Sequence, residues 1–294
     1  RLQSATHRPG GDGRHKERQM SQSPDLTLAP AAASVACALQ ASGLTKVFSS
    51  RAELWSQERR TVALADVSFD LRASEILAVV GESGSGKTTL GRLIVGLEKP
   101  DSGWIARGGA FLDDSEKGVF TPPAQRGIGM IFQDPNSSLN PRMTVGAIVG
   151  EGLELAGVGR RERNERVAAA LDLVGLQRKD MDRYPHQFSG GQRQRIGIAR
   201  AIVIEPSILI ADEAVSSLDV SVQMQVLNLI LDIRDKLGLA VIFITHNIGV
   251  VEYLCDQVIV LSQGCVVERG PTMQVTSNPQ HPYTRGLLSA VPRI

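Results

Sequence analysis

The sequence lacks the features expected of a chain that is secreted or that crosses a membrane. Its three cysteines, Cys37, Cys255 and Cys265, are odd in number and form no Cys-x-x-Cys pair, which argues against a disulfide framework and fits a reducing compartment. No apolar run approaches the roughly 20 residues that a transmembrane helix needs. The formal net charge is only +1, so no overall field draws the chain to nucleic acid or to an anionic membrane surface. Any membrane contact is therefore expected to be made through other proteins.

The remaining composition is that of a globular protein with a leader. With 294 residues, 42% of them hydrophobic, the chain can bury a full core as one large domain with appendages. A basic stretch at 14–18 precedes an Ala-rich stretch at 26–39, a pattern faintly similar to a secretory signal. Pro30 interrupts the apolar part, which favours a disordered leader, with Met20 as an alternative start. We expect residues 1–40 to lie outside the fold.

From Ala41 onward, short apolar β-type runs alternate with helical patterns, which predicts a mostly parallel sheet covered by helices. Strands are expected at Leu44–Phe48, Val62–Leu71, Glu75–Val80, Ile128–Phe132, Ile208–Ala211 and Ala240–Thr245, and a closing hairpin at Val258–Leu261 and Cys265–Glu268. Helices are expected at Lys87–Val95, Thr144–Ala156, Arg161–Leu173, Gly191–Val203 and Ser221–Leu237. The sheet pattern stops for about fifty residues after Phe132, which indicates an inserted helical subdomain.

A glycine-rich segment with the spacing of a phosphate-binding loop follows the expected strand Glu75–Val80. Its glycines let the backbone curl so that N–H groups face phosphate oxygens. Lys87 supplies a cation for the β and γ phosphates, and the Thr88 hydroxyl is suited to hold Mg²⁺. The predicted nucleotide-binding residues of this segment are Gly81, Glu82, Ser83, Gly84, Ser85, Gly86, Lys87, Thr88 and Thr89.

Two consecutive carboxylates follow the apolar strand around Ile208–Ala211. Asp212 is suited to hold Mg²⁺ and Glu213 to face an attacking water. A buried strand that ends in a solvated acidic turn gives the same pattern, but the phosphate-binding loop in the same chain favours the functional interpretation.

A turn made of Ser189, Gly190, Gly191 and Gln192 precedes a long helix, where it can either cap the helix or direct backbone donors at an anion. The motifs stand in the order phosphate loop, Gln133 after a strand, this turn, Asp212-Glu213, Ser217-Leu218-Asp219, and His246 after a strand. In that order and spacing, over residues 45–270, the chain resembles the ABC (ATP-binding cassette) ATPase family.

The resemblance implies roles for single residues. Phe48 resembles the aromatic residue that stacks on adenine, although a lone Phe at a strand end is also a common core residue. Gln133 resembles the glutamine that senses Mg²⁺ and water, and His246 the switch histidine that contacts the γ phosphate, where a core histidine is the alternative. The catalytic residues implied are Glu213, His246, Lys87 and Gln133, and those implied for Mg²⁺ are Thr88, Gln133 and Asp212.

In this family two subunits enclose two ATP molecules, each between one phosphate loop and the Ser-Gly-Gly-Gln turn of the opposite subunit. The resemblance therefore implies that a monomer is nearly inactive. It also implies that Ser189 to Gln192 contact ATP from across the interface and that the Asp219 loop couples the two sites.

Several segments resemble the oligopeptide, dipeptide and nickel importer branch of the family. They are Ser138–Arg142, Tyr184–Gln187, Asp219–Gln223 and the tail Asn278–Thr284 with Leu287, Leu288 and Pro292. As chemistry alone, the tail is a proline-punctuated surface helix in which His281 has no partners for a metal site.

Phe188, Gln192 and Asn140–Arg142 are similar to the F-type ATPase of such importers, which implies a heterodimer with a D-type sister subunit, although a homodimer remains open. Ala214-Val215 stands where Pro-Thr is usual, and Asn247 where Asp often follows the histidine. Neither departure removes a catalytic group, although Asn247 lacks the carboxylate expected there.

The sequence thus predicts an α/β P-loop NTPase (RecA-like) fold with a mostly parallel sheet, an inserted helical subdomain and an antiparallel β edge. Its predicted parts are the nucleotide-binding domain at 41–270, with the helical subdomain at about 134–190, and a C-terminal element at 271–294. The predicted function is ATP hydrolysis at the cytoplasmic face of the cell (inner) membrane. It would energise uptake of peptides, or of nickel, glutathione or a sugar, through two permease subunits and, indirectly, an extracytoplasmic solute-binding protein, without nucleic acid.

Three other functions fit the sequence less well. A P-loop GTPase or kinase would have no use for the Ser189–Gln192 turn, and no Asn-Lys-x-Asp guanine motif is present. ABC proteins that act on ribosomes or in DNA repair usually carry two cassettes in one chain or a long coiled coil. An export ATPase is the nearest alternative, and the tail around His281 argues against it.

Overall fold

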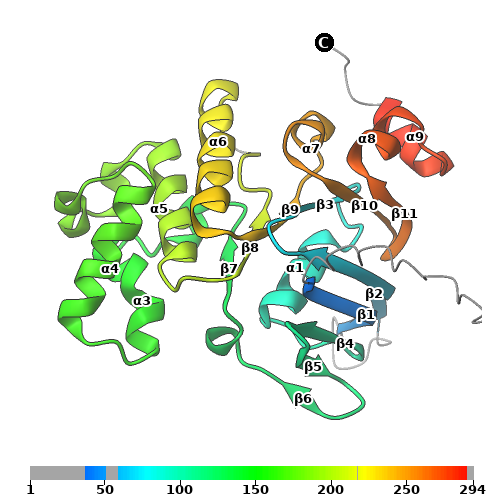
Figure 1. The fold of residues 1–294 in the computed structure, drawn as a ribbon, viewed down its shortest axis with the longest axis horizontal. Coiled ribbons are helices and arrows are strands. Elements are labelled where there is room, and N and C mark those ends of the chain that lie inside the picture. Colours follow the sequence, from blue (N-terminus) through cyan, green and yellow to red (C-terminus); the bar gives the residue numbers. More distant parts are fainter. Residues whose placement is uncertain (1–36, 51–58, 217, 290–294) are drawn as a thin grey trace, which may run out of the picture. The chain divides into compact units, whose positions relative to one another are not determined.

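The structure, a computed structural model, describes residues 37–50, 59–216 and 218–289 and contains two β-sheets with helices packed on them (Figure 1). The leader before Cys37, residues 51–58, Ser217 and Pro292 lie outside the described residues. The first strand begins at Cys37, so residues 37–40, which the sequence assigned to the leader, belong to the folded domain.

A five-stranded antiparallel sheet forms one part of the structure. Its strands, in spatial order, are β2 (Arg59–Arg72), β1 (Cys37–Ser50), β4 (Ser102–Arg107), β5 (Ala110–Asp114) and β6 (Val119–Phe120). In β2 the apolar Val67, Phe69 and Leu71 are buried, while Asp70 between them is exposed, as the alternation predicts. The sequence indicated only an antiparallel edge, and it did not identify β4, β5 and β6.

A six-stranded sheet carries the motifs. Its strands, in spatial order, are β11 (Cys265–Pro271), β10 (Gln257–Ser262), β3 (Ile76–Val80), β9 (Ala240–Ile244), β8 (Ile208–Asp212) and β7 (Ile128–Ile131). The five strands from β10 to β7 pair in parallel, and β11 pairs antiparallel with β10 at one edge. The fold class predicted from the sequence is confirmed.

Both faces of the parallel strands are buried, which is why their sequences are continuously apolar. In β3, Ile76, Ala78 and Val80 enter one hydrophobic core, and Leu77 and Val79 enter the other. Helix α1 (Lys87–Val95) contributes to the second core together with residues of the five-stranded sheet. The helix that follows the phosphate loop is therefore packed between the two sheets.

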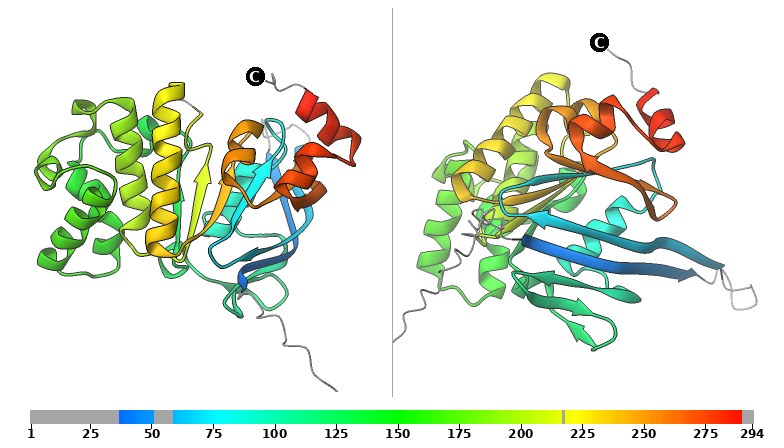
Figure 2. Two further views of the ribbon diagram at one scale, coloured as in Figure 1. Left: turned by 45° about the horizontal axis from the view of Figure 1, so that its top comes forward. Right: turned by 45° about the vertical axis from the view of Figure 1, so that its right-hand side comes forward.

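The other helices cover the opposite face and the ends of the six-stranded sheet. They are α2 (Pro135–Ser138), α3 (Val145–Leu155), α4 (Arg160–Leu173), α5 (Gly190–Ile202), α6 (Val220–Leu237), α7 (Ile248–Leu254), α8 (Thr272–Ser277) and α9 (Pro282–Ser289). The described part of the chain also contains short 3-10 turns at Pro123–Gln125, Arg178–Asp182 and Pro185–Gln187. Figures 1 and 2 show α3, α4 and α5 as one group of helices beyond β7 and β8.

The cysteines and the apolar character of the helices can be seen in the structure. Cys37, Cys255 and Cys265 all lie within the described residues and are free thiols. Within the described ranges, we find no helix with the length and apolar character that crossing a membrane requires.

A buried ion pair joins the antiparallel sheet to α1. Arg126 is 0% exposed and donates to both carboxylate oxygens of Asp113, at distances of 2.8 and 2.6 Å. Asp113 is itself only 1% exposed. The same guanidinium donates to the carbonyls of Leu93 and Ile94 in the last turn of α1 and to that of Thr121. It therefore satisfies carbonyls that a helix end leaves unpaired and fixes α1 against β5.

Replacing Asp113 by Asn should destabilise the domain strongly, because the change keeps the shape and leaves the Arg126 charge buried without a counter-charge. We expect a loss of about 3–5 kcal/mol in the free energy of unfolding, measured by urea denaturation. Glu165→Gln is the matched control. Glu165 forms an ion pair with Arg178 through two hydrogen bonds, but both side chains are 61% exposed, so the pair should contribute little to the free energy of unfolding. Equal stability of the two variants would contradict this account.

Candidate active site

Four parallel strands deliver the predicted site residues to one edge of the sheet. The phosphate loop follows β3, His246 follows β9, Asp212 and Glu213 lie at the end of β8, and Gln133 follows β7. These strands are neighbours in the order β3, β9, β8, β7, so their carboxyl ends lie side by side. In α/β sheets this edge is where ligands bind.

The phosphate loop has a backbone that only glycine permits at its end. Gly86 lies at the start of α1 with φ of 106°, and a Cβ atom there would come within 2.4 Å of the Ala63 carbonyl oxygen. The loop therefore packs directly against β2, and the N-terminus of α1 points its unpaired N–H groups toward the loop.

Lys87 is a buried cation held only by carbonyl groups. Its Nζ donates to the carbonyl oxygens of Gly81 and Glu82, at 2.8 Å each, and forms no ion pair with any described residue. Burial lowers the pKa of Lys87, against the opposing effect of the Glu213 and Asp212 carboxylates. A phosphate group beside Lys87 would supply the missing counter-charge, so the residue fits the predicted role.

Thr88 and Asp212 present hydroxyl and carboxylate oxygens at one point. Thr88 Oγ1 donates to Asp212 Oδ1 at 3.3 Å. Burial raises the pKa of Asp212, and the nearby Glu213 carboxylate adds to this effect, while the Thr88 hydrogen bond opposes it. Oxygen donors of this kind suit Mg²⁺, whose charge would offset the burial of the carboxylate. The donor set therefore fits the predicted metal.

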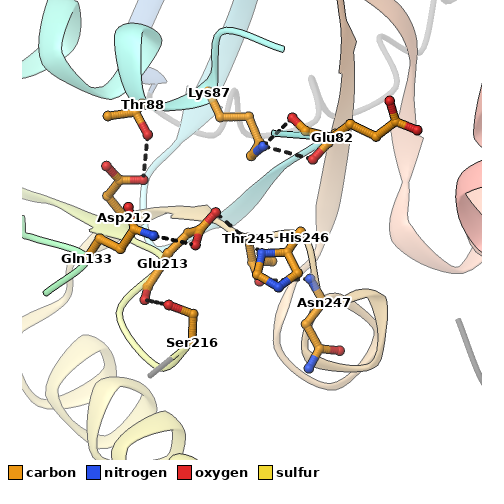
Figure 3. Close-up of polar contacts among 11 residues, drawn as sticks. Glu82, Lys87, Thr88, Gln133, Asp212, Glu213, Ser216, Thr245, His246 and Asn247 are labelled. Atoms are coloured by element: carbon orange, nitrogen blue, oxygen red, sulfur yellow. Dashed lines mark hydrogen bonds and ion pairs between the residues drawn. The ribbon is translucent and has the colours of Figure 1, made fainter. Parts of the chain in front are cut away.

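Glu213 lies between Gln133 and His246, as Figure 3 shows. Gln133 Nε2 donates to Glu213 Oε2 at 2.9 Å, and His246 Nδ1 lies 3.3 Å from Glu213 Oε1. The His246 side chain is 58% exposed, which rules out the alternative of a core histidine. Glu213 thus contacts both of the other residues proposed to act with it in catalysis.

The backbone at Glu213 is strained. Its φ of 46° lies in the left-handed region, which is uncommon for a residue other than glycine. The conformation is held by hydrogen bonds from Glu213 N to the Ile244 carbonyl and from Ser216 N and Oγ to the Glu213 carbonyl, at 2.9, 3.1 and 3.0 Å. Strain of this kind is typical of functional sites, where it fixes the direction of a side chain.

The predicted catalytic residues and Thr88 line one hollow of about 360 Å³, whereas Asp212 is not among its lining residues. It is lined by Thr61, Val62, Ala63, Ser83, Gly84, Gly86, Lys87, Thr88, Thr89, Gln133, Glu213 and His246. Its volume is within the usual range of small-molecule sites. Residues 61–63 of β2 were not predicted as part of the site, because no local motif in the sequence marks them.

Phe48 lies on β1 beside this hollow rather than in the core. It pairs with Thr61 across the two antiparallel strands, so their side chains share one face of the sheet. Phe48 is 39% exposed, which rules out the core alternative, and its ring lies 5.4 Å from the Lys46 ammonium. The position is compatible with stacking on a base, which remains a prediction.

The Ser-Gly-Gly-Gln turn lies in a different hollow, of about 510 Å³, which shares no lining residue with the first. Ser189 caps α5, where its Oγ accepts from Gln192 N at 3.3 Å and Gln192 Oε1 accepts from Ser189 N at 3.0 Å. A Cβ on Gly191 would lie 2.6 Å from Val222 of α6, so glycine permits close packing there. Asp219 also lines this second hollow. The structure therefore brings neither the Ser-Gly-Gly-Gln turn nor Asp219 to the phosphate loop.

The two departures from the common family pattern leave the catalytic groups in place. Ala214 and Val215 are buried behind Glu213. Asn247 stands before α7 and makes no side-chain hydrogen bond to that helix, while its N–H donates to Thr245 Oγ1 at 3.0 Å. The Asn247 side chain is thus not one of the two side chains that contact the Glu213 carboxylate, which are Gln133 and His246.

Two family models match the sequence. One, described as "ABC transporter", matches residues 64–216, just over half of the chain. The other, described as "Oligopeptide/dipeptide transporter, C-terminal region", matches residues 267–294.

Individual proteins give the same assignment. The "Dipeptide transport ATP-binding protein DppF" of Haemophilus influenzae is 47% identical over 259 residues, which cover 87% of this chain and 78% of that protein. Among solved structures, cbiO1 from Clostridium perfringens, part of the ABC transporter complex cbiONQ, has a TM-score of 0.68 at 30% identity, covering 82% of this chain and 91% of that one. The dimeric cassette MJ0796 bound to ADP and Pi has a TM-score of 0.65 at 28% identity, covering 80% and 98%. The chain therefore belongs to the ABC transporter ATP-binding proteins, in their oligopeptide/dipeptide branch.

Proposed function

We propose that this chain hydrolyses ATP to drive peptide uptake by an ABC importer, at the cytoplasmic face of the membrane. The observation that carries the proposal is the contact of Glu213 with Gln133 and His246 beside a complete phosphate loop. This arrangement supplies the groups that phosphoryl transfer to water requires.

The separation of the two hollows supports a two-subunit site. The turn at Ser189 and the phosphate loop lie in different hollows of one chain, so a second subunit would have to supply the turn that faces this chain's loop. MJ0796, which shares the fold, is a dimer. We infer that the functional unit contains two ATP-binding subunits, with a D-type sister chain as the second.

The chemistry follows from the residues that surround the hollow. Glu213 accepts a hydrogen bond from Gln133 and is therefore oriented to accept the proton of a water. The water oxygen forms a bond to the γ phosphorus in line with the breaking bond to the β–γ bridging oxygen, and ADP leaves. Lys87 and the N–H groups of the loop balance the charge of the phosphates. Mg²⁺, held by Thr88, Asp212 and Gln133, would neutralise further charge on the transferring group.

The solute is inferred from the family branch. The C-terminal segment 267–294 matches the oligopeptide/dipeptide transporter region, and the Haemophilus influenzae relative is named for dipeptide transport. Two permease chains would carry the solute, delivered by an extracytoplasmic binding protein, and the helical subdomain containing α3–α5 would contact the permeases. Peptide is the solute that these relationships favour over nickel, glutathione or a sugar.

Glu213→Gln should abolish turnover and preserve ATP binding, because the amide cannot accept the water proton while its oxygen can still accept from Gln133. We expect the steady-state rate to fall by about 10²- to 10⁴-fold and the ATP-bound dimer to accumulate, as measured by phosphate release and by size-exclusion chromatography. Glu165→Gln, in the helical subdomain, should hydrolyse ATP at the normal rate. Rapid turnover by the Glu213 variant would remove Glu213 from the mechanism.

Ser189→Asp and Lys87→Ala should distinguish the roles of the two halves of the proposed composite site, because one should affect hydrolysis alone and the other nucleotide binding. Aspartate is a good helix N-cap, so Ser189→Asp should keep α5 intact while its charge repels the γ phosphate of the opposite site. We expect normal ADP binding and at least about a tenfold loss of hydrolysis. Lys87→Ala should lose ADP binding itself, measured by calorimetry. Loss of ADP binding in the Ser189 variant would place the turn in the same site as the phosphate loop.

Purification of the chain from its native membrane, with identification of bound proteins by mass spectrometry, tests the transport role. We expect two permeases and a sister ATP-binding subunit. Recovery of ribosomal or DNA-bound partners would leave the ATPase chemistry standing and contradict transport. Recovery of the chain with itself as the second ATPase would correct the heterodimer to a homodimer.

A further inference from the structure

The C-terminal element contacts the phosphate loop through one tyrosine. The N–H of Glu82, the second residue of the loop, donates to the Tyr283 hydroxyl at 2.9 Å. Tyr283 lies on α9, 201 residues further along the chain, and α9 lies beside α8 and β11 in Figures 1 and 2. The tail that the sequence analysis used only as a marker of the branch therefore reaches the nucleotide site.

Glu82 is held from both sides of its backbone. Its N–H is bound by Tyr283, and its carbonyl oxygen accepts from Lys87 Nζ at 2.8 Å. Further along the loop, the Ser85 carbonyl accepts from Gly264 N at 3.0 Å, in the turn between β10 and β11. The C-terminal segments thus hold the outer side of the loop, while Lys87 and Thr88 line the hollow.

Tyr283 is itself fixed by a set of contacts to β11. Both carboxylate oxygens of Glu268 accept backbone hydrogen bonds, from Gln280 N at 2.8 Å and from His281 N at 3.0 Å. His281 Nδ1 accepts from Tyr283 N at 3.1 Å, and Tyr283, Leu287 and Leu288 pack against the larger core. Burial alone would raise the pKa of Glu268, but these N–H groups hold it below its ordinary value, so the carboxylate is ionised near neutral pH.

We propose that Tyr283 is a positioning residue for nucleotide binding: its hydroxyl holds the Glu82 peptide so that the phosphate loop is preformed before the nucleotide arrives. This inference rests on the proposed function, because it concerns the same ATP site. A loop that is already ordered loses less conformational entropy on binding, so the affinity for nucleotide is higher. The hydroxyl does not touch the reacting atoms, so the rate at saturating ATP should not depend on it.

Tyr283→Phe tests the hydroxyl alone, because the ring and its packing are kept. We expect the dissociation constant for Mg-ADP, measured by calorimetry on the full chain, to rise by about three- to tenfold, the size of one modest hydrogen bond. The melting temperature without nucleotide and the rate at saturating ATP should be unchanged. Mg-ADP is the probe because it requires the phosphate loop and not the opposite subunit.

Tyr253→Phe is the matched control. Tyr253 also makes one hydroxyl hydrogen bond, to Asn228 Oδ1 at 2.8 Å between α7 and α6, but it does not contact the loop. Its removal should leave ADP affinity unchanged. Equal ADP affinity of the Tyr283 variant and the unmodified chain would overturn the inference and leave the proposed function intact, whereas failure of the unmodified chain to bind Mg-ADP would count against the proposed function itself.

A double-mutant cycle tests the route from Glu268 to the loop. Glu268→Gln replaces one carboxylate oxygen by an NH₂ group, which cannot accept a hydrogen bond from the backbone N–H opposite it. The variant should therefore loosen α9 and, like Tyr283→Phe, raise the dissociation constant for Mg-ADP. If Glu268 acts through Tyr283, it should have little further effect in the Tyr283→Phe background. Additive losses would show that Glu268 acts by another path and would overturn this part of the inference.

Hydrogen exchange tests the contact first in the unmodified chain, without relying on the folding of a variant. In the unmodified chain without nucleotide, the Glu82 amide should exchange more slowly than an exposed loop amide, and Tyr283→Phe should accelerate it. Fast exchange at Glu82 in the unmodified chain would show that the contact does not persist in solution and would overturn the proposal.

Discussion

The parallel register of β3, β9, β8 and β7 is the constraint on which the rest of the structure depends. Four segments separated by up to 165 residues, from the loop at Gly81 to His246, become neighbours only because their strands run in the same direction and end at the same edge. Parallel strands need crossover connections, which the helices supply, and both faces of such a sheet must be covered. The two cores and the position of α1 between the sheets follow from that requirement.

The same geometry supports the composite site that we propose, in which one chain holds only part of the catalytic groups. The strand ends gather the phosphate loop, Gln133, Glu213 and His246, whereas the turn at Ser189 begins a helix of the group containing α3–α5. No strand end carries that turn, so the sheet cannot bring it to the loop of the same chain. The composite site that we propose, shared with a partner subunit, would therefore follow from which residues the sheet can gather and which it cannot.

The sequence predicted those features of the fold and site that depend on contiguous residues or on family motifs. The phosphate loop was identified because strand, glycines and helix are contiguous, and Asp212 because it ends an apolar strand. Arg126 and Asp113 were missed, since nothing local shows that two charged residues will be fully buried together. The hairpin between β4 and β5 had a signal in Gly108-Gly109, both with positive φ, that the sequence analysis did not use. Thr61 reaches the hollow, and Tyr283 reaches the phosphate loop, only through long-range pairing and packing. The tail motif contains Tyr283 but does not indicate this position.

The site contains two buried charged groups that its own residues compensate only in part. Lys87 and Asp212 are both buried at the same edge of the sheet, and among the described residues they form no ion pair with each other. Burial shifts the pKa of each toward its neutral form, which is the direction expected for charges that lack a full partner. A nucleotide phosphate beside Lys87 and a Mg²⁺ beside Asp212 would remove both penalties at once. Ligand binding would then offset part of the cost of burying these two groups. A phosphate loop already held by Gly264 and by the proposed Tyr283 contact would meet the nucleotide with less loss of conformational entropy.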